Sequence, residues 1–219
     1  RSFLINQGFE HITEDADFPV TELLSKWGVP DEYVFERALV DIKQQDANAA
    51  HLTVIQTSSS HEPYDVPYNK LNNKILNAFA YTDNCLGKFV NALKQLPTWK
   101  NTLVVLVPDH QGCYPENLDN YTPERYHIPL LLIGGALKAK GHIATYGSQA
   151  DMAATLLSQL GISYSEFTFS KDMLNPNVPH FAFSTVPNAF MMKTNDNTVF
   201  FNCETNKTIL DNGKTPGVN

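Results

Sequence analysis

The sequence predicts an α/β fold, in which helices cover a mostly parallel sheet, followed by a small antiparallel β meander. Three observations carry this prediction. Residues 102–107 form an apolar, β-branched run without a polar break, as in a strand buried on both faces. Stretches with helical periodicity separate such runs. From Pro179 onward, short segments rich in Phe, Thr and Val alternate with polar turns.

In the first half, residues 1–29 show weak periodicity and predict a loop that crosses a surface. A helix is predicted to begin near Pro30, a residue favoured in the first turn. Residues 52–55 predict a second buried strand. The longest helix follows and ends at Pro97. Its predicted core-facing stripe recurs at steps of three and four and consists of Leu71, Ile75, Phe79, Thr82, Leu86, Phe89, Leu93 and Leu96.

In the second half, residues 114–126 are polar and predict irregular structure, and residues 128–133 predict another strand. Residues 149–160 predict an amphipathic helix that Gly161 stops. The meander strands are predicted at residues 180–186, 189–193, 198–202 and 207–210. We therefore expect two domains, an α/β part over residues 1–178 and a meander over residues 179–219.

Composition excludes several classes of protein. The 219 residues are 42% hydrophobic and 18% charged, which suits a globular chain with a core. The net charge of −7 provides no basic surface for nucleic acid. No apolar run is long enough for a membrane span, and the three cysteines match no disulfide framework or zinc module. Because the chain starts at Arg1, we expect it to be a processed or truncated piece.

Asp109 and His110 are the leading candidates for chemistry. They follow the run 102–107 and Pro108, and ligands bind beyond the carboxyl ends of strands in open α/β sheets. A carboxylate beside an imidazole suits a divalent cation such as Zn or Mn. A helix cap or a surface turn is the alternative. Two ligands cannot hold a catalytic metal, so further ligands must lie elsewhere.

His61 and Trp27 are weaker candidates. His61 follows the predicted strand 52–55 and would donate to an anionic oxygen of a substrate, unless it is simply a solvated loop histidine. Ser60 and His61 are adjacent, which does not align a nucleophile with a base. Trp27 is either a core anchor or a lid over a pocket. Arg125 and His127 precede the strand at 128–133 and so lie at its wrong end.

Together, several stretches resemble the C-terminal half of a sulfatase-like domain of the alkaline phosphatase superfamily. The likeness is greatest to lipoteichoic acid synthase-like phosphoglycerol transferases. It covers roughly residues 8–175 and rests on residues 27–35, 58–64, 81–87, 109–110 and 148–157. The order and spacing of these stretches are more specific than any one motif.

The resemblance implies that Asp109 and His110 hold a divalent cation, usually manganese, with zinc, magnesium or calcium as alternatives. It also implies that His61 contacts a substrate phosphate and that Trp27 lies near the headgroup pocket. The chain departs from the family pattern at Pro108 and at Gln111, which stands where the family has glycine. Either residue would reshape the loop without removing the ligands.

The family's first half carries an acidic metal ligand and a nucleophile, and we find neither here, so no catalytic residue is predicted within this chain. We expect the C-terminal part of a metal-dependent phosphoryl- or sulfuryl-transfer enzyme, inactive without the missing N-terminal half. Its substrate would be an anionic phosphate or sulfate ester. The parent protein would lie at the extracytoplasmic face of the cell envelope, anchored by membrane helices outside this chain.

Two other hypotheses stay open at the level of the sequence. The chain could be a non-catalytic module that keeps the fold and binds an anionic glycan or a lipid headgroup. It could also be a structural fragment with no ligand.

Overall fold

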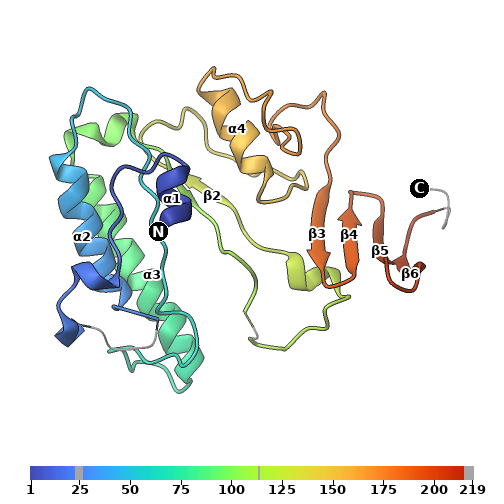
Figure 1. The fold of residues 1–219 in the computed structure, drawn as a ribbon, viewed down its shortest axis with the longest axis horizontal. Coiled ribbons are helices and arrows are strands. Elements are labelled where there is room, and N and C mark those ends of the chain that lie inside the picture. The colour runs from blue at the N-terminus through green and yellow to red at the C-terminus, as the bar shows by residue number, and fades with distance from the viewer. Residues whose placement is uncertain (23–26, 113, 215–219) are drawn as a thin grey trace. The chain divides into compact units, whose positions relative to one another are not determined.

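A computed structural model describes residues 1–22, 27–112 and 114–214 (Figure 1). Contacts between residues divide the chain into two units. The first unit contains Arg1–Val104 and Ile133–Leu137, and the second contains Val105–Leu132 and the remainder of the chain. Neither boundary falls at residues 178/179, and the division expected there stays a prediction.

Helices dominate the first unit. They are α1 (Ser2–Asn6), α2 (Asp31–Gln44) and α3 (Lys74–Leu93), with 3-10 turns at Asp15–Asp17, Val20–Glu22 and Pro97–Asn101. The α2 helix begins directly after Pro30, as predicted. The Asn73 side chain caps α3 by accepting a hydrogen bond from Leu76 N at 3.0 Å. None of the described helices is long and apolar enough to cross a membrane.

The core of the first unit lies between α2 and α3, which run side by side (Figure 1). The Phe35 and Phe89 rings meet with their centroids 4.9 Å apart. Five residues form the buried centre: Phe35, Tyr81, Cys85, Phe89 and Leu93. The predicted stripe is therefore correct at Phe89 and Leu93, whereas Leu71 and Leu96 lie outside α3, and the buried Ala78, Tyr81 and Cys85 each precede a predicted position by one residue. Tyr81 and Cys85 are the buried residues, and their neighbours Thr82 and Leu86 are only half-buried.

The strand predicted at residues 52–55 is wrong. These residues form no strand, and the side chains of Leu52 and Val54 are 80% and 66% exposed. Only Ile55 packs against the core. The apolar composition suggested a strand covered on both faces, but among the described residues no neighbouring strand pairs with this segment.

Two of the predicted strands exist but are short. The strands β1 (Val104–Leu106) and β2 (Leu131–Ile133) are hydrogen-bonded neighbours, and neither is buried on both faces. Gly134 follows β2 with a φ of +141°, and a Cβ atom there would collide with the carbonyl oxygen of Thr102. Only glycine allows the chain to pass so close to residue 102.

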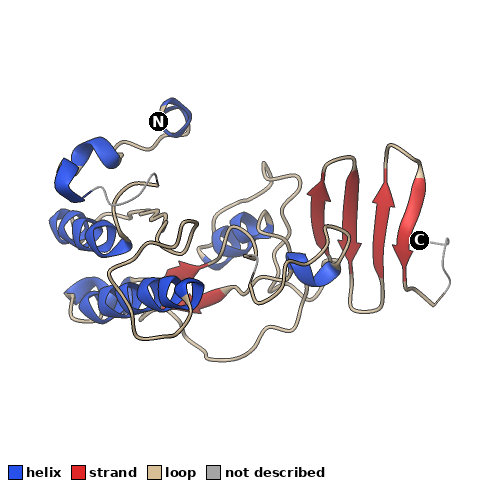
Figure 2. Ribbon diagram, turned by 90° about the horizontal axis from the view of Figure 1, so that it is seen from below, coloured by secondary structure: helices blue, strands red, loops and turns tan. Residues whose placement is uncertain are grey.

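The second unit contains a 3-10 turn (Pro123–Tyr126), the helix α4 (Asp151–Gln159) and the predicted meander. Gly161, with a φ of +68°, follows α4 as expected. Four antiparallel strands pair in chain order (Figure 2). They are β3 (Ala182–Val186), β4 (Ala189–Lys193), β5 (Thr198–Asn202) and β6 (Lys207–Asp211), within two residues of the predicted bounds.

One face of the meander is buried. Met191 and Phe200 point to this face, and the Tyr121 and Tyr126 rings pack on Phe200 with centroids 6.1 and 6.0 Å away. Because side chains alternate along a strand, Phe190 lies on the opposite face. The alternation of apolar side chains in the meander strands is therefore explained by one face that packs on residues of the second unit.

Phe35→Ala tests the core between α2 and α3. We expect it to lower the free energy of unfolding of the first unit by about 3–5 kcal/mol, since it removes a buried ring that packs on Phe89. Urea unfolding measures this loss. Phe169→Ala, which truncates an exposed ring, should change stability by only about 0.5 kcal/mol. Equal losses in the two variants would contradict the assignment of the core.

Candidate functional site

Asp109 and His110 lie on the loop that follows β1, in the second unit. The carboxylate oxygen Oδ2 of Asp109 is 3.5 Å from the imidazole Nε2 of His110. Both side chains are open to solvent, at 85% and 68% exposure. The other carboxylate oxygen accepts a hydrogen bond from the His110 backbone N at 2.9 Å. The two functional groups therefore lie side by side, and their predicted role as metal ligands stays a prediction.

A backbone carbonyl orients the His110 ring. Its Nδ1 lies 2.9 Å from the carbonyl oxygen of Gln111. A carbonyl only accepts, so Nδ1 donates this bond, and Nε2 is the ring nitrogen that lies on the side of Asp109. Metal-binding histidines are commonly oriented in this way. Two ligands about 2.1 Å from a shared tetrahedral ion lie about 3.4 Å apart, so the separation of Oδ2 and Nε2 fits a common cation.

Two glutamines support this loop. Gln149, just before α4, donates from Nε2 to the carbonyl oxygens of Pro108 (2.8 Å) and Asp109 (2.9 Å). With its amide nitrogen directed inward, Gln111 donates to the carbonyl oxygens of Glu124 (2.7 Å) and Arg125 (3.2 Å). The departure from the family pattern at Gln111 therefore attaches the loop to the 3-10 turn at Pro123–Tyr126.

The described residues contain no group of three or more His, Cys, Asp and Glu side chains that could hold a metal ion. Asp109 and His110 thus offer two donors, and Cys113 lies outside the described part of the chain. Arg125 donates to the carbonyl oxygen of Leu118 at 2.9 Å, which is a structural bond.

His61 and Trp27 meet in the first unit. Their ring centroids are 4.1 Å apart and the planes are tilted by 45°. Trp27 is 45% exposed, so it does not anchor the core, and its ring packs on the exposed His61 ring. His61 Nδ1 lies 3.1 Å from the carbonyl oxygen of Glu62, which assigns the proton to Nδ1. We also expect His61 to share a crevice with Asp109, because both follow predicted strands of one sheet, and with Asp109 in the second unit this stays a prediction.

A small pocket lies beside His61. Gly28, Pro30, Ser58, Ser59 and Asp65 contribute to its wall. Gly28 has a φ of +103°, and a Cβ atom there would collide with the carboxylate of Asp15. The charge of Asp65 is compensated by Lys74, whose Nζ lies 2.6 Å from Oδ1. The pocket wall therefore combines two serines and several apolar residues with His61 and one charge-compensated carboxylate.

Sequence reasoning assigned no role to Asp31, which is fully buried at the start of α2. Its Oδ1 accepts hydrogen bonds from Ser58 N (2.8 Å) and Ser59 N (3.0 Å). Its Oδ2 accepts from the Thr82 hydroxyl at 2.6 Å, and its own backbone N donates to Ser59 Oγ at 2.9 Å. We call these four bonds the Asp31 clamp.

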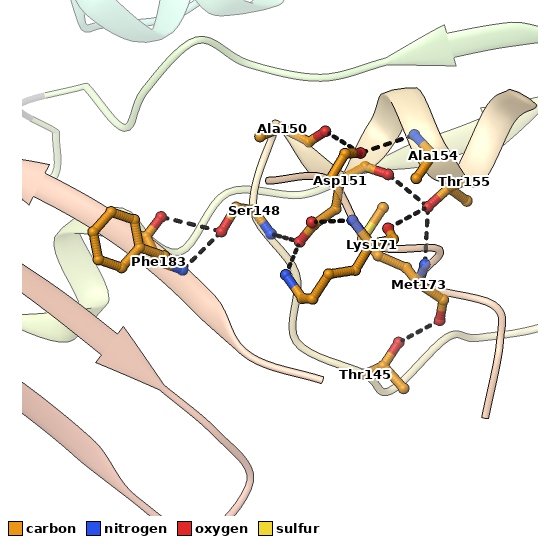
Figure 3. A network of polar contacts seen from close by, with 10 residues as sticks. Thr145, Ser148, Ala150, Asp151, Ala154, Thr155, Lys171, Met173 and Phe183 are labelled. Carbon is orange, nitrogen blue, oxygen red and sulfur yellow. Dashed lines mark hydrogen bonds and ion pairs between the residues drawn. The ribbon is translucent and has the colours of Figure 1, made fainter. Parts of the chain in front are cut away.

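Asp151 forms a similar clamp in the second unit and was also missed (Figure 3). Its buried carboxylate accepts from Ser148 N at 2.8 Å, from Lys171 N at 2.9 Å and from the Lys171 ammonium at 2.7 Å. The Thr155 hydroxyl, one turn along α4, donates to the Asp151 carbonyl at 2.7 Å and accepts from Met173 N at 2.9 Å. The Ser148-x-x-Asp151 spacing of a capping box was the available sequence signal.

Cys85 does not supply a nucleophile. It lies in the core of the first unit, and burial raises the pKa of its thiol above the ordinary value. Burial also raises the pKa of the neighbouring Tyr81 hydroxyl. Both groups therefore stay protonated at neutral pH, when a thiolate would be needed for attack.

The fold is that of the alkaline phosphatase superfamily. A superfamily member from Vibrio parahaemolyticus superposes with a TM-score of 0.74 at 23% identity, over 92% of this chain and 54% of the other. The lipoteichoic acid synthase LtaP from Listeria monocytogenes superposes with a TM-score of 0.72 at 19% identity, over 95% and 60%. These comparisons confirm the predicted fold class.

A profile of the sulfatase family matches residues 2–162, and the chain belongs to this family. Arylsulfatase K of Canis lupus familiaris is 33% identical over 103 residues, which are 43% of this chain and 19% of the relative. Phosphoglycerol transferase I of Xanthomonas campestris pv. campestris (strain ATCC 33913) is 22% identical over 196 residues, or 81% and 28%. The chain thus spans less than a third of the length of either relative.

Gln149→Leu tests the support of the Asp109 loop. We expect greater backbone mobility at Asp109 and His110, because two hydrogen bonds to the loop are lost. Their ¹⁵N order parameters should fall from about 0.85 to below about 0.6. Gln159→Leu, an exposed change at the end of α4, should leave them unchanged. Identical order parameters in wild type and Gln149→Leu would show that the loop does not need this side chain.

Proposed function

We propose that this chain is the C-terminal, metal- and phosphate-binding part of a metal-dependent enzyme that transfers phosphoryl or sulfuryl groups. The pairing of Asp109 Oδ2 with His110 Nε2, with Nδ1 bonded to a carbonyl, is the observation that carries the proposal. Membership of the sulfatase family supports the reaction class. The similarity to phosphoglycerol transferase I over 81% of this chain favours a phosphoglycerol substrate over a sulfate ester.

In this proposal Asp109 and His110 provide two of the ligands to a divalent cation, manganese first, with zinc, magnesium and calcium as alternatives. The bound cation would activate a nucleophile and neutralise charge on the transferred group. His61 would donate from Nε2 to a phosphate or sulfate oxygen in its imidazolium form, because its Nδ1–H is already engaged by the Glu62 carbonyl. Trp27 would form the wall of the headgroup pocket above it.

The remaining metal ligands and the nucleophile would come from an N-terminal half of the same domain. The chain spans 54% and 60% of the two similar structures, which supports this division. We place the whole protein at the extracytoplasmic face of the cell envelope, held by membrane helices outside this chain. The similarity to a lipoteichoic acid synthase supports that location.

Metal titration of the chain tests the pair. We expect Mn²⁺ to bind weakly in isothermal titration calorimetry, and Asp109→Ala or His110→Ala to weaken binding by at least about tenfold, since each removes a direct ligand. Asp196→Ala and His142→Ala remove an exposed carboxylate and an exposed imidazole elsewhere and should change nothing. Equal affinity in all five proteins would refute a site at Asp109 and His110 and favour the non-catalytic module.

We also expect no turnover from the chain alone. With manganese, magnesium or zinc added, it should not hydrolyse generic phosphate or sulfate esters, because a catalytic metal needs about three protein ligands and the reaction needs a nucleophile. Release of p-nitrophenol from its phosphate and sulfate esters measures this. Metal-dependent turnover that Asp109→Ala abolishes would mean that a nucleophile lies within these residues, with Thr57 and Ser58 as the first candidates.

A further inference from the structure

We propose that Asp31 is the positioning residue for the proposed substrate contact, because it holds together the two chain segments that carry His61 and Trp27. This inference rests on the substrate role of His61 proposed above. In this proposal Asp31 acts through the backbone that bears the two rings, by way of its bonds to Ser58 and Ser59.

The Asp31 carboxylate is surrounded by hydrogen-bond donors rather than by a cationic side chain. Asp31 is fully buried, and no Lys, Arg or His among the described residues forms an ion pair with it. Its charge is instead met by Ser58 N, Ser59 N and the Thr82 hydroxyl. The N-terminal end of α2 adds a favourable dipole. A buried carboxylate without these donors would lower the stability of the fold, so the four bonds of the clamp are expected to persist in the folded state.

A turn at residues 58–61 connects the clamp to His61. The bonds from Ser58 N and Ser59 N fix the start of a turn, and His61 N closes that turn by donating to the Ser58 carbonyl at 3.0 Å. His61 is therefore two residues beyond Ser59, whose hydroxyl also accepts from Asp31 N. These bonds leave the backbone of residues 58–61 little conformational freedom, and the His61 ring is attached to that backbone.

A short segment also connects the clamp to Trp27, which lies four residues before Asp31. The intervening Gly28, Val29 and Pro30 are buried, so this segment is short and packed. The clamp thus joins residues 27–31 to residues 58–61, and the 4.1 Å contact between the rings lies across that junction. Displacement of either segment would separate the imidazole from the indole.

The test is NMR on the whole chain, with nuclear Overhauser effects between the His61 and Trp27 ring protons as the readout. Asp31→Asn keeps the shape of the side chain but replaces one acceptor with a donor. Thr82→Val removes a single hydroxyl from the clamp. Thr155→Val is the matched control, because it removes a helical hydroxyl from the Asp151 clamp in the other unit.

We expect the ring-to-ring effects to be lost in Asp31→Asn and at least halved in Thr82→Val, and to be unchanged in Thr155→Val. Circular dichroism identifies variants that remain folded. If Asp31→Asn does not fold, Thr82→Val decides the question together with Ser59→Ala, which removes the reciprocal bond. Full-strength effects in folded Asp31→Asn, or in both Thr82→Val and Ser59→Ala, would overturn the proposal. So would an equal loss in Thr155→Val, which would indicate a general loss of packing.

A ligand titration separates this inference from the proposed function. In a Trp99→Phe background, Trp27 is the single tryptophan and its emission reports binding of glycerol phosphate. We expect Asp31→Asn to raise the dissociation constant by about tenfold relative to that background, which corresponds to about 1.4 kcal/mol. No binding by the background protein would refute the substrate role of His61, while the NMR result would still decide the role of Asp31. An unchanged dissociation constant would refute the link between Asp31 and the ligand.

Discussion

A carboxylate that is cut off from water must be surrounded by hydrogen-bond donors, and both units of this protein depend on one such group. Asp31 begins α2 and Asp151 begins α4, and each is fully buried. Each collects backbone N–H groups from a loop that leads to a candidate functional side chain. The Asp31 loop continues to His61, and the Asp151 loop continues to Gln149, which supports Asp109. The two buried carboxylates thus hold the backbone of the loops that carry His61 and Gln149.

The sequence predicted local structure better than pairing between distant segments. The meander was found to within two residues, because hairpins depend on neighbouring strands and on turns such as those at Asn188 and Asn206, which adopt positive φ. The helices α2 and α4 were signalled by Pro30 and Gly161. The strand prediction at residues 52–55 was wrong because an apolar run indicates only that burial is favourable. It does not indicate whether a neighbouring strand is available to pair with it.

At the candidate site, the sequence identified the exposed groups and missed their supports. Asp109 and His110 could be named as candidates because their position after a strand has a chemical meaning. Asp31 could not, since an acidic residue in the first turn of a helix is ordinary and favourable there, and Asp151 offered only the Ser148-x-x-Asp151 spacing. Their importance depends on burial and on contacts up to 51 positions away in the sequence, such as that between Asp31 and Thr82. Single-sequence patterns do not contain that information.

The exposed segment at residues 52–55 has a practical consequence for handling the protein. It is β-branched and apolar, without charge or proline, which is the composition of segments that stack into intermolecular cross-β assemblies. Its residues Leu52, Thr53 and Val54 are exposed, and of the four only Ile55 packs against the core. A lysine at position 52 or 54 would act as a gatekeeper against such self-association and leave Ile55 packed.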